Sequence, residues 1–110
     1  MSLHWGIEKA FYPSPKQVAL AHKLIDSGAT IILGHHPHVI QGIENYKSGL
    51  IAYSLGNFQF AFDPKECSNE NNKRTNQSFI LKVRINKQEI ESYDIVRCSA
   101  IHGACYGAST

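Results

Sequence analysis

The chain has 110 residues, a formal net charge of +2 at pH 7, 43% hydrophobic residues and 18% charged residues. This length allows one domain with a modest core, and the composition is globular rather than disordered. So small a charge does not indicate a nucleic-acid partner. No apolar run approaches the roughly 20 residues that cross a bilayer, so any membrane attachment is expected outside this sequence.

The first third of the chain carries the signals of a strand and a helix. Residues 1–6 are predicted to be the end of a strand that enters a loop. Residues 14–17, Ser-Pro-Lys-Gln, form a capping box with proline at the first helical position. Apolar residues then recur at helical spacing, and Gly28 suits a left-handed cap. These signals predict a helix over residues 15–27.

The apolar run at residues 30–33 shows no alternation of polar and apolar side chains. Such a run is typical of a strand that is buried on both faces. A helix followed by a buried strand predicts an α/β fold, and the strand needs a covering layer on each side. Because the sequence offers one convincing helix, the second layer is expected from another chain or from a missing segment.

Two β-hairpins are predicted in the remainder of the chain. Residues 39–54 contain two β-rich runs joined at 47–49, and residues 79–96 contain two more joined around 86–88. Between the hairpins, residues 63–77 are polar and predict a solvated loop.

Cysteine spacing gives no disulfide framework, because Cys67, Cys98 and Cys105 are an odd number without paired spacing. Cys98 and Cys105 could hold zinc together with His102, but structural zinc sites normally take four ligands at tighter spacing. The other interpretation is a frayed C-terminal tail. The roles of the three cysteines and the redox compartment therefore stay open.

Residues 34–38, Gly-His-His-Pro-His, directly follow the predicted buried strand. Imidazole is the commonest metal ligand among side chains, and α/β sheets bind ligands at this end of their strands. Pro37 favours an extended conformation at His36, and alternate residues of extended backbone project to one side. We therefore expect His36 and His38 to converge on one ion and His35 to point away. The alternative is a surface loop whose histidines are merely polar.

Other histidines and acidic residues give weaker signals. Taken alone, His4 is more typical of a buried structural histidine than of a ligand, and His22 is expected to face solvent in the middle of the helix. The acidic residues Glu8, Asp26 and Glu44 are too few and too scattered to assemble the carboxylate-rich cluster of a two-metal hydrolase. Three histidines could hold one zinc-like ion.

Four short motifs follow one another over about residues 3 to 62. They are His4-Trp5-Gly6 with Glu8, Pro15 with Gln17, Gly34-His35-His36-Pro37-His38-Val39, and Tyr53-Ser54-Leu55-Gly56-Asn57-Phe58. Together they resemble the CapA family of bacterial capsule and poly-γ-glutamate synthesis proteins, which belongs to the calcineurin-like metallophosphoesterase superfamily. The predicted hairpin at 79–96 fits the family's C-terminal strands but carries no motif.

The resemblance implies an α/β sandwich that holds two divalent ions, of which Mn, Fe and Zn are the candidates. It implies that the metal ligands in this sequence are His4, His36 and His38. It also implies that His35, Glu8 and Asn57 orient a ligand or contact the substrate, Asn57 from a supporting turn. The family's remaining ligands and its catalytic histidine match no segment here. Residues 1–110 are therefore expected to be the C-terminal half of one CapA-like domain, with no assigned catalytic residue.

The resemblance leaves two functions open. The first is a metal-dependent hydrolase of the phosphoesterase type, acting in capsule or poly-γ-glutamate biosynthesis, with this fragment inactive alone. The alternative is a non-catalytic accessory or binding subunit of the surface-polymer synthesis and export machinery. A weaker interpretation is a small mononuclear metal-binding protein.

Location and assembly follow from the same resemblance. It implies a cell-surface or membrane-associated extracellular location and partners in the polymer synthesis machinery. Because a half-domain exposes strand edges, we expect the fragment to form homo-oligomers or strand-exchanged assemblies.

Overall fold

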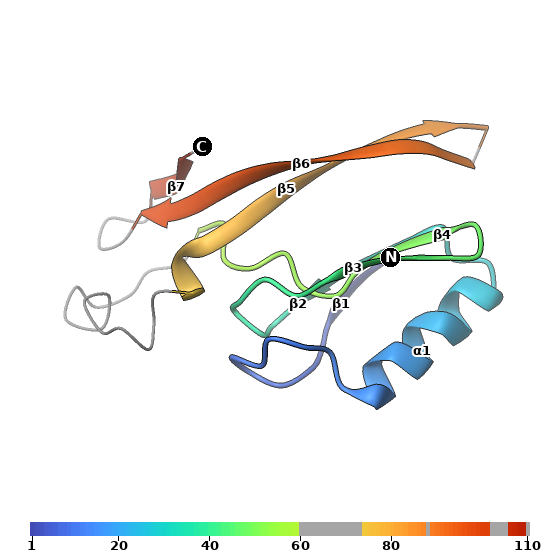
Figure 1. Cartoon of the computed structure of the whole chain (residues 1–110), viewed down its shortest axis with the longest axis horizontal. Coiled ribbons are helices and arrows are strands. Elements are labelled where there is room, and N and C mark those ends of the chain that lie inside the picture. Colours follow the sequence, from blue (N-terminus) through green and yellow to red (C-terminus); the bar gives the residue numbers. More distant parts are fainter. Residues whose placement is uncertain (60–73, 88, 102–105, 110) are drawn as a thin grey trace.

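A computed structural model describes residues 1–59, 74–87, 89–101 and 106–109 (Figure 1). Its elements are β1 (Ser2–His4), α1 (Pro15–Asp26), β2 (Ile31–His35), β3 (Ile43–Tyr46), β4 (Gly49–Ala52), β5 (Gln77–Asn86), β6 (Glu89–Ile101) and β7 (Tyr106–Ser109). They form a four-stranded sheet in the order β1-β2-β4-β3 and a three-stranded sheet in the order β5-β6-β7. The predicted α/β class is confirmed.

Helix α1 begins as the sequence predicts. The backbone N–H of Gln17 donates to the Ser14 hydroxyl at 3.3 Å, and the Ser14 N–H donates to the Gln17 side chain at 2.9 Å. These two bonds satisfy backbone donors that the first helical turn cannot pair internally. The helix ends at Asp26, one residue before the predicted end, and Gly28 adopts the expected left-handed conformation with φ of 112°.

The main core lies between α1 and one face of the four-stranded sheet. Its buried members are Ala21, Ile25, Ile32, Ile51 and Tyr53, and Leu3 and Trp5 pack against them. Burying one large apolar side chain contributes roughly 1.5–3 kcal/mol. This core therefore fixes β1 and β2, the strands that end in the histidine motifs.

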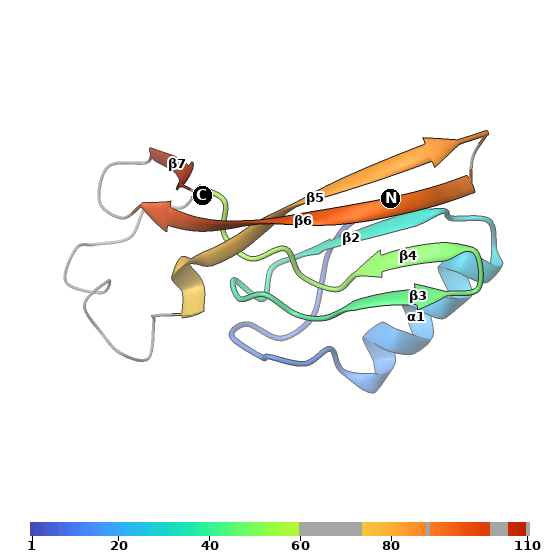
Figure 2. The same cartoon turned by 45° about the horizontal axis from the view of Figure 1, so that its top comes forward.

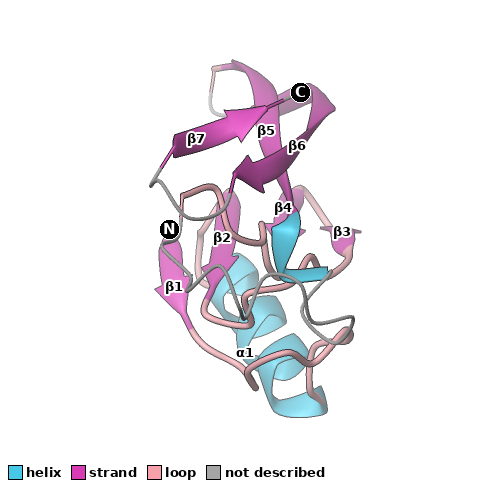
Figure 3. Cartoon of the chain, turned by 90° about the vertical axis from the view of Figure 1, so that its left-hand side faces the viewer, coloured by secondary structure: helices cyan, strands magenta, loops and turns pink. Residues whose placement is uncertain are grey.

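The second sheet covers the other face of the first sheet, which is a correction to the sequence-based expectation. Figures 1 and 2 show the β5–β6 hairpin on the side of the four-stranded sheet opposite α1, and Figure 3 shows the same three layers end-on. Residues 55–56 join the sheets, because the Phe79 N–H donates to the Leu55 carbonyl at 3.2 Å and Gly56 forms a bridge with Ser78. The second layer comes from this chain's own hairpin.

Both predicted hairpins are present. In the first, β3 and β4 pair antiparallel, but β3 begins only at Ile43, and upstream Ile40 forms an isolated bridge with Leu55. In the second, β5 and β6 pair from Gln77↔Ser99 to Asn86↔Glu89, so this hairpin is longer than predicted.

Residues 106–109 form a strand, where the sequence favours a frayed tail. Strand β7 pairs antiparallel with β6, with Ser109 opposite Ser99. The composition of the tail is only weakly β-like and does not predict a strand. The strand forms where the outer edge of β6 offers backbone groups that it can pair. Cys98 is buried and is a free cysteine. Cys67, His102, Cys105 and the predicted loop up to residue 73 lie outside the described residues.

Candidate metal centre

His4 and His35 end two neighbouring parallel strands. β1 pairs with β2 in a register that sets His4 opposite His35 and Leu3 opposite Gly34. Side chains alternate between the faces of a strand, and Leu3 packs into the core on the α1 side. His4 and His35 therefore project from the opposite face, at the carboxyl ends of their strands.

Four histidines line one cavity of about 620 Å³ on this face. We call it the histidine pocket, and its histidines are His4, His35, His36 and His38. The ring centres of His4 and His36 are 4.6 Å apart, and those of His36 and His38 are 5.8 Å apart. Residues from β5, including Phe79 and Leu81, line the same cavity.

The backbone of the histidine loop differs from the predicted extended conformation. His36 has φ of 103° and His38 has φ of 61°, so the ring approach does not arise from the alternation of an extended strand. Pro37 between them is buried, and its carbonyl accepts the Lys9 N–H at 2.7 Å. Anchoring Pro37 under the loop after β1 makes the chain turn sharply. Such positive φ values in residues other than glycine are costly and concentrate at functional sites.

His35 is also placed differently from the expectation. It was predicted to point away from the other two histidines, but it lines the histidine pocket together with Leu33. The two residues are two apart on β2 and therefore share one face. The prediction failed because it extended the strand geometry of β2 into the following loop.

Asn57 is a hydrogen-bond partner of His38. The Asn57 Oδ1 lies 2.8 Å from the His38 Nδ1, and the Asn57 Nδ2 donates to the Thr75 carbonyl at 3.1 Å. Since an amide oxygen only accepts, the His38 Nδ1 must carry the proton of this bond. Asn57 is 6% exposed, so the bond is shielded from water.

Three residues of the motifs, to which the sequence assigns no role of their own, hold β2 in place. The Trp5 indole N–H donates to the Tyr53 carbonyl at 3.0 Å, and the two rings stack. A Cβ at Gly34 would lie 1.9 Å from the Tyr53 carbonyl oxygen and 2.4 Å from the Trp5 Nε1. Only glycine therefore fits before the histidines, and a glycine in this strand was the available signal.

His22 is only partly exposed, with 29% of its side chain accessible, and it has partners that the prediction of a solvent-facing residue did not include. Its Nε2 lies 2.7 Å from a Glu44 carboxylate oxygen, and its ring stacks on Tyr46 at 3.8 Å. The Tyr53 hydroxyl donates to Glu44 at 2.6 Å. This bond, ahead of the contact with His22, holds the pKa of Glu44 below its ordinary value, and burial together with Glu44 raises the pKa of Tyr53.

No carboxylate joins the histidines in the part of the chain that the structure describes. Glu8 is exposed and is not among the residues that line the histidine pocket. Within the same residues, no group of three or more His, Cys, Asp and Glu side chains is arranged to hold a metal ion. The pocket therefore offers imidazoles without the bridging oxygen ligands of a two-metal site.

These features indicate a class of fold. Parallel strands that end in histidines, with a helix on one face and a second sheet on the other, are consistent with a fragment of a metallophosphoesterase-like α/β fold. Residues 1–62 match the family described as "Bacterial capsule synthesis protein PGA_cap". The chain belongs to this family.

Comparisons with curated proteins agree with this assignment and confirm the CapA resemblance. The chain is 57% identical over 60 residues to "Capsule biosynthesis protein CapA" of Bacillus anthracis, which covers 54% of this chain and 15% of that protein. It is 53% identical over 57 residues to "PGA biosynthesis protein CapA" of Bacillus subtilis, covering 52% and 15%. It is 39% identical over 56 residues to a "Probable polyglutamine synthesis accessory protein" of Mycobacterium tuberculosis, covering 51% and 15%.

These matches span about 15% of the length of each of the three relatives. The segment that matches the family contains β1 to β4, all three predicted metal ligands and Asn57. It leaves out the second sheet. In the part of the chain that the structure describes, no helix is long and apolar enough to cross a membrane.

Proposed function

We propose that this chain of the capsule and poly-glutamate biosynthesis family is part of a metal-dependent hydrolase of the phosphoesterase type. In this proposal His4, His36 and His38 bind one divalent ion in the histidine pocket, and Mn, Fe and Zn are the candidate metals. Because the described residues hold no three ligands already arranged around an ion, binding requires these side chains to reorient. The observation that supports it most is the spacing of the three rings, 4.6 Å and 5.8 Å between neighbouring centres. Metal–nitrogen bonds of about 2 Å at tetrahedral angles place the ring centres of two bound imidazoles about 5 Å apart.

The local chemistry fits a divalent ion. Histidines that bind metals commonly donate their other ring N–H to a fixed acceptor, and the bond from the His38 Nδ1 to Asn57 has this form. An ion at His38 would be bound through Nε2. When bound, a divalent ion polarises the substrate and activates water. The roles of this chain's residues are to hold the imidazoles and, through β5, to cover the pocket.

The ligand set is incomplete within the described residues. A two-metal hydrolase needs oxygen ligands that bridge or neutralise its ions, and no carboxylate of a described residue lines the histidine pocket. We therefore propose that the remaining ligands come from protein outside this chain. The chain alone is expected to bind a metal ion but to lack hydrolase activity.

One comparison favours a second candidate function. The relative from Mycobacterium tuberculosis carries the name of an accessory protein. On this alternative the chain belongs to a non-catalytic accessory subunit of the polymer machinery, and its metal is structural. The two candidates differ in one respect, which is whether a full-length protein that contains this segment hydrolyses a phosphodiester.

The experiment is a Mn²⁺-dependent assay of bis(p-nitrophenyl) phosphate hydrolysis. We expect no turnover by the 110-residue chain and turnover by a full-length protein that contains it, with loss of that turnover on His38→Ala. Turnover by the short chain that survives purification and vanishes on His38→Ala would contradict the incomplete site. A full-length protein that binds metal but shows no turnover would favour the accessory function.

Location and assembly are part of the proposal. Relatives named for capsule biosynthesis favour association with the cell envelope and partners in the surface-polymer synthesis machinery. Strands β1 and β3 lie at the two edges of the four-stranded sheet, and open edges can pair with another chain. Light scattering is expected to show homo-oligomers of the 110-residue chain, and a stable monomer would contradict this part of the proposal.

A further inference from the structure

A second cavity, of about 580 Å³, lies between the two sheets. We call it the arginine pocket. Its lining combines apolar side chains with two cationic groups, and the residues that matter here are Phe11, Gln41, Ile43, Arg74, Ile95 and Arg97. It shares Ser78 and Phe79 with the histidine pocket, so the two cavities are neighbours.

The charge of the arginine pocket is positive. Arg74 comes from the turn before β5, and its guanidinium lies 4.2 Å from the centre of the Phe11 ring. Arg97 comes from β6, and among the residues that the structure describes no aspartate or glutamate lines the cavity. Guanidinium groups recognise carboxylates through paired hydrogen bonds. The electrostatics therefore favour an anionic ligand over a neutral or cationic one.

Gln41 adds a requirement for a hydrogen-bond donor. Its side chain is 3% exposed, and its Nε2 donates to the Ala10 carbonyl at 2.8 Å. Its Oε1 is buried and has no hydrogen-bond partner among the described residues. Buried acceptors are normally paired, so a ligand that brings an N–H group would satisfy this oxygen. An amide supplies that donor, whereas a simple inorganic anion supplies none or a poor one.

We propose that the arginine pocket is a binding site for an acidic, amide-linked chain. Its carboxylates would meet Arg74 and Arg97, an amide N–H would meet the Gln41 Oε1, and its methylene groups would lie on Phe11 and Ile95. This assignment rests on the proposed function only for the choice of a glutamate polymer as the ligand. Since the two pockets are neighbours, a polymer held here passes beside the histidine pocket.

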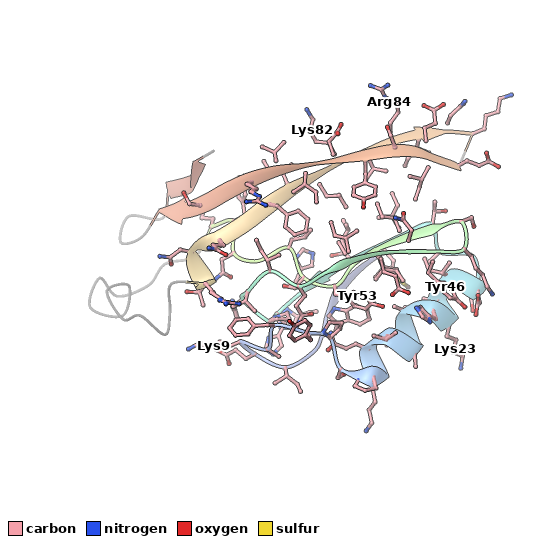
Figure 4. All side chains as sticks on the ribbon, in the orientation of Figure 1. Lys9, Lys23, Tyr46, Tyr53, Lys82 and Arg84 are labelled. Carbon is pink, nitrogen blue, oxygen red and sulfur yellow. The ribbon has the colours of Figure 1, made fainter. Side chains whose placement is uncertain are left out.

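The test is NMR titration of the full chain with a γ-linked glutamate oligomer, a γ-linked glutamine oligomer of equal length, and inorganic phosphate. Arg74→Gln and Arg97→Gln are the test variants. Arg84→Gln is the matched control, because Figure 4 shows Arg84 and Lys82 on the outer side of the β5–β6 hairpin, pointing away from the first sheet. The glutamate oligomer should shift resonances that line the arginine pocket. Each test variant should weaken binding at least about tenfold, with little change in the control.

Three outcomes would overturn the proposal. Equal weakening of binding in Arg84→Gln would mean a diffuse attraction to a basic surface. Binding of the glutamine oligomer as tightly as the glutamate oligomer would remove the role of the carboxylates. Phosphate binding as tightly as the glutamate oligomer would make this a general anion site. Metal binding by the histidine pocket is measured on the same samples. Intact metal binding without oligomer binding rejects this inference alone, while the reverse rejects the proposed metal site alone.

Discussion

The Asn57 carboxamide bonds the His38 imidazole at 2.8 Å and fixes which ring nitrogen carries the proton. The same carboxamide donates to the Thr75 carbonyl, next to the start of β5. One buried side chain thus ties the histidine loop to the second sheet. This arrangement orients a ring in the way that metal-binding histidines are usually oriented.

Replacing Asn57 should weaken metal binding more than it disturbs the fold. Asn57→Ala removes the acceptor for the His38 Nδ1–H, and loss of such a partner typically costs 10- to 100-fold in metal affinity. Asn57→Asp keeps an oxygen acceptor for His38 but loses the Nδ2 donor to the Thr75 carbonyl, so it should retain more of the affinity than Asn57→Ala. Competition titration with a zinc chelator measures both, and equal loss in the two variants would argue against an orienting role.

Gly34→Ala should destabilise the chain by about 2–3 kcal/mol, the upper range for overpacking. The added Cβ would collide with the Tyr53 carbonyl and the Trp5 ring. Gly42→Ala is the matched control, because a Cβ there meets no described residue within 4 Å. Urea denaturation measures both free energies of unfolding. Similar values for the two variants would show that the close approach at Gly34 is not a constraint.

Glu44 should give the fold an acid-sensitive contribution to stability. Its pKa in the folded chain lies below the ordinary value of 4.5, mainly because Tyr53 donates to it. A lowered folded pKa means that the contribution is fully present above the unfolded pKa and is lost as pH falls through the folded pKa. Glu44→Gln should therefore flatten the fall in stability below about pH 4.5 and cost about 1 kcal/mol near neutrality.

Urea midpoints between pH 3 and pH 7 check this prediction. Glu91→Gln, at an exposed position on β6, serves as the control. Parallel pH profiles for the parent chain and Glu44→Gln would show that the bond from Tyr53 contributes nothing to acid sensitivity.

The helix and the hairpins could be predicted because local signals determine them. The capping box at residues 14–17 and the glycine after the helix act within a few residues, and both are present. The turns of the hairpins were likewise marked by local composition. Strand β7 could not be predicted, because its stability depends on the free edge of β6 rather than on its own residues.

The sequence indicates which histidines lie together but not their geometry, and their role as metal ligands stays a proposal. Motif matching brought His4, His36 and His38 together, and the structure places all three at one pocket. The predicted orientation of His35 is wrong, because the turn after β2 depends on how Pro37 packs under a distant loop. Such a tertiary contact leaves no periodic signal in the sequence. The arginine pocket needs residues from both sheets, so no single motif indicates it.

Metal titration of histidine variants tests the central claim most directly. Co²⁺ binding to the full chain, followed by its visible absorption, should fall by at least about tenfold in His4→Ala, His36→Ala and His38→Ala. His22→Gln, outside the histidine pocket, should bind Co²⁺ as the parent chain does. Equal binding by all four variants, or equal loss in His22→Gln, would contradict a divalent metal site in the histidine pocket.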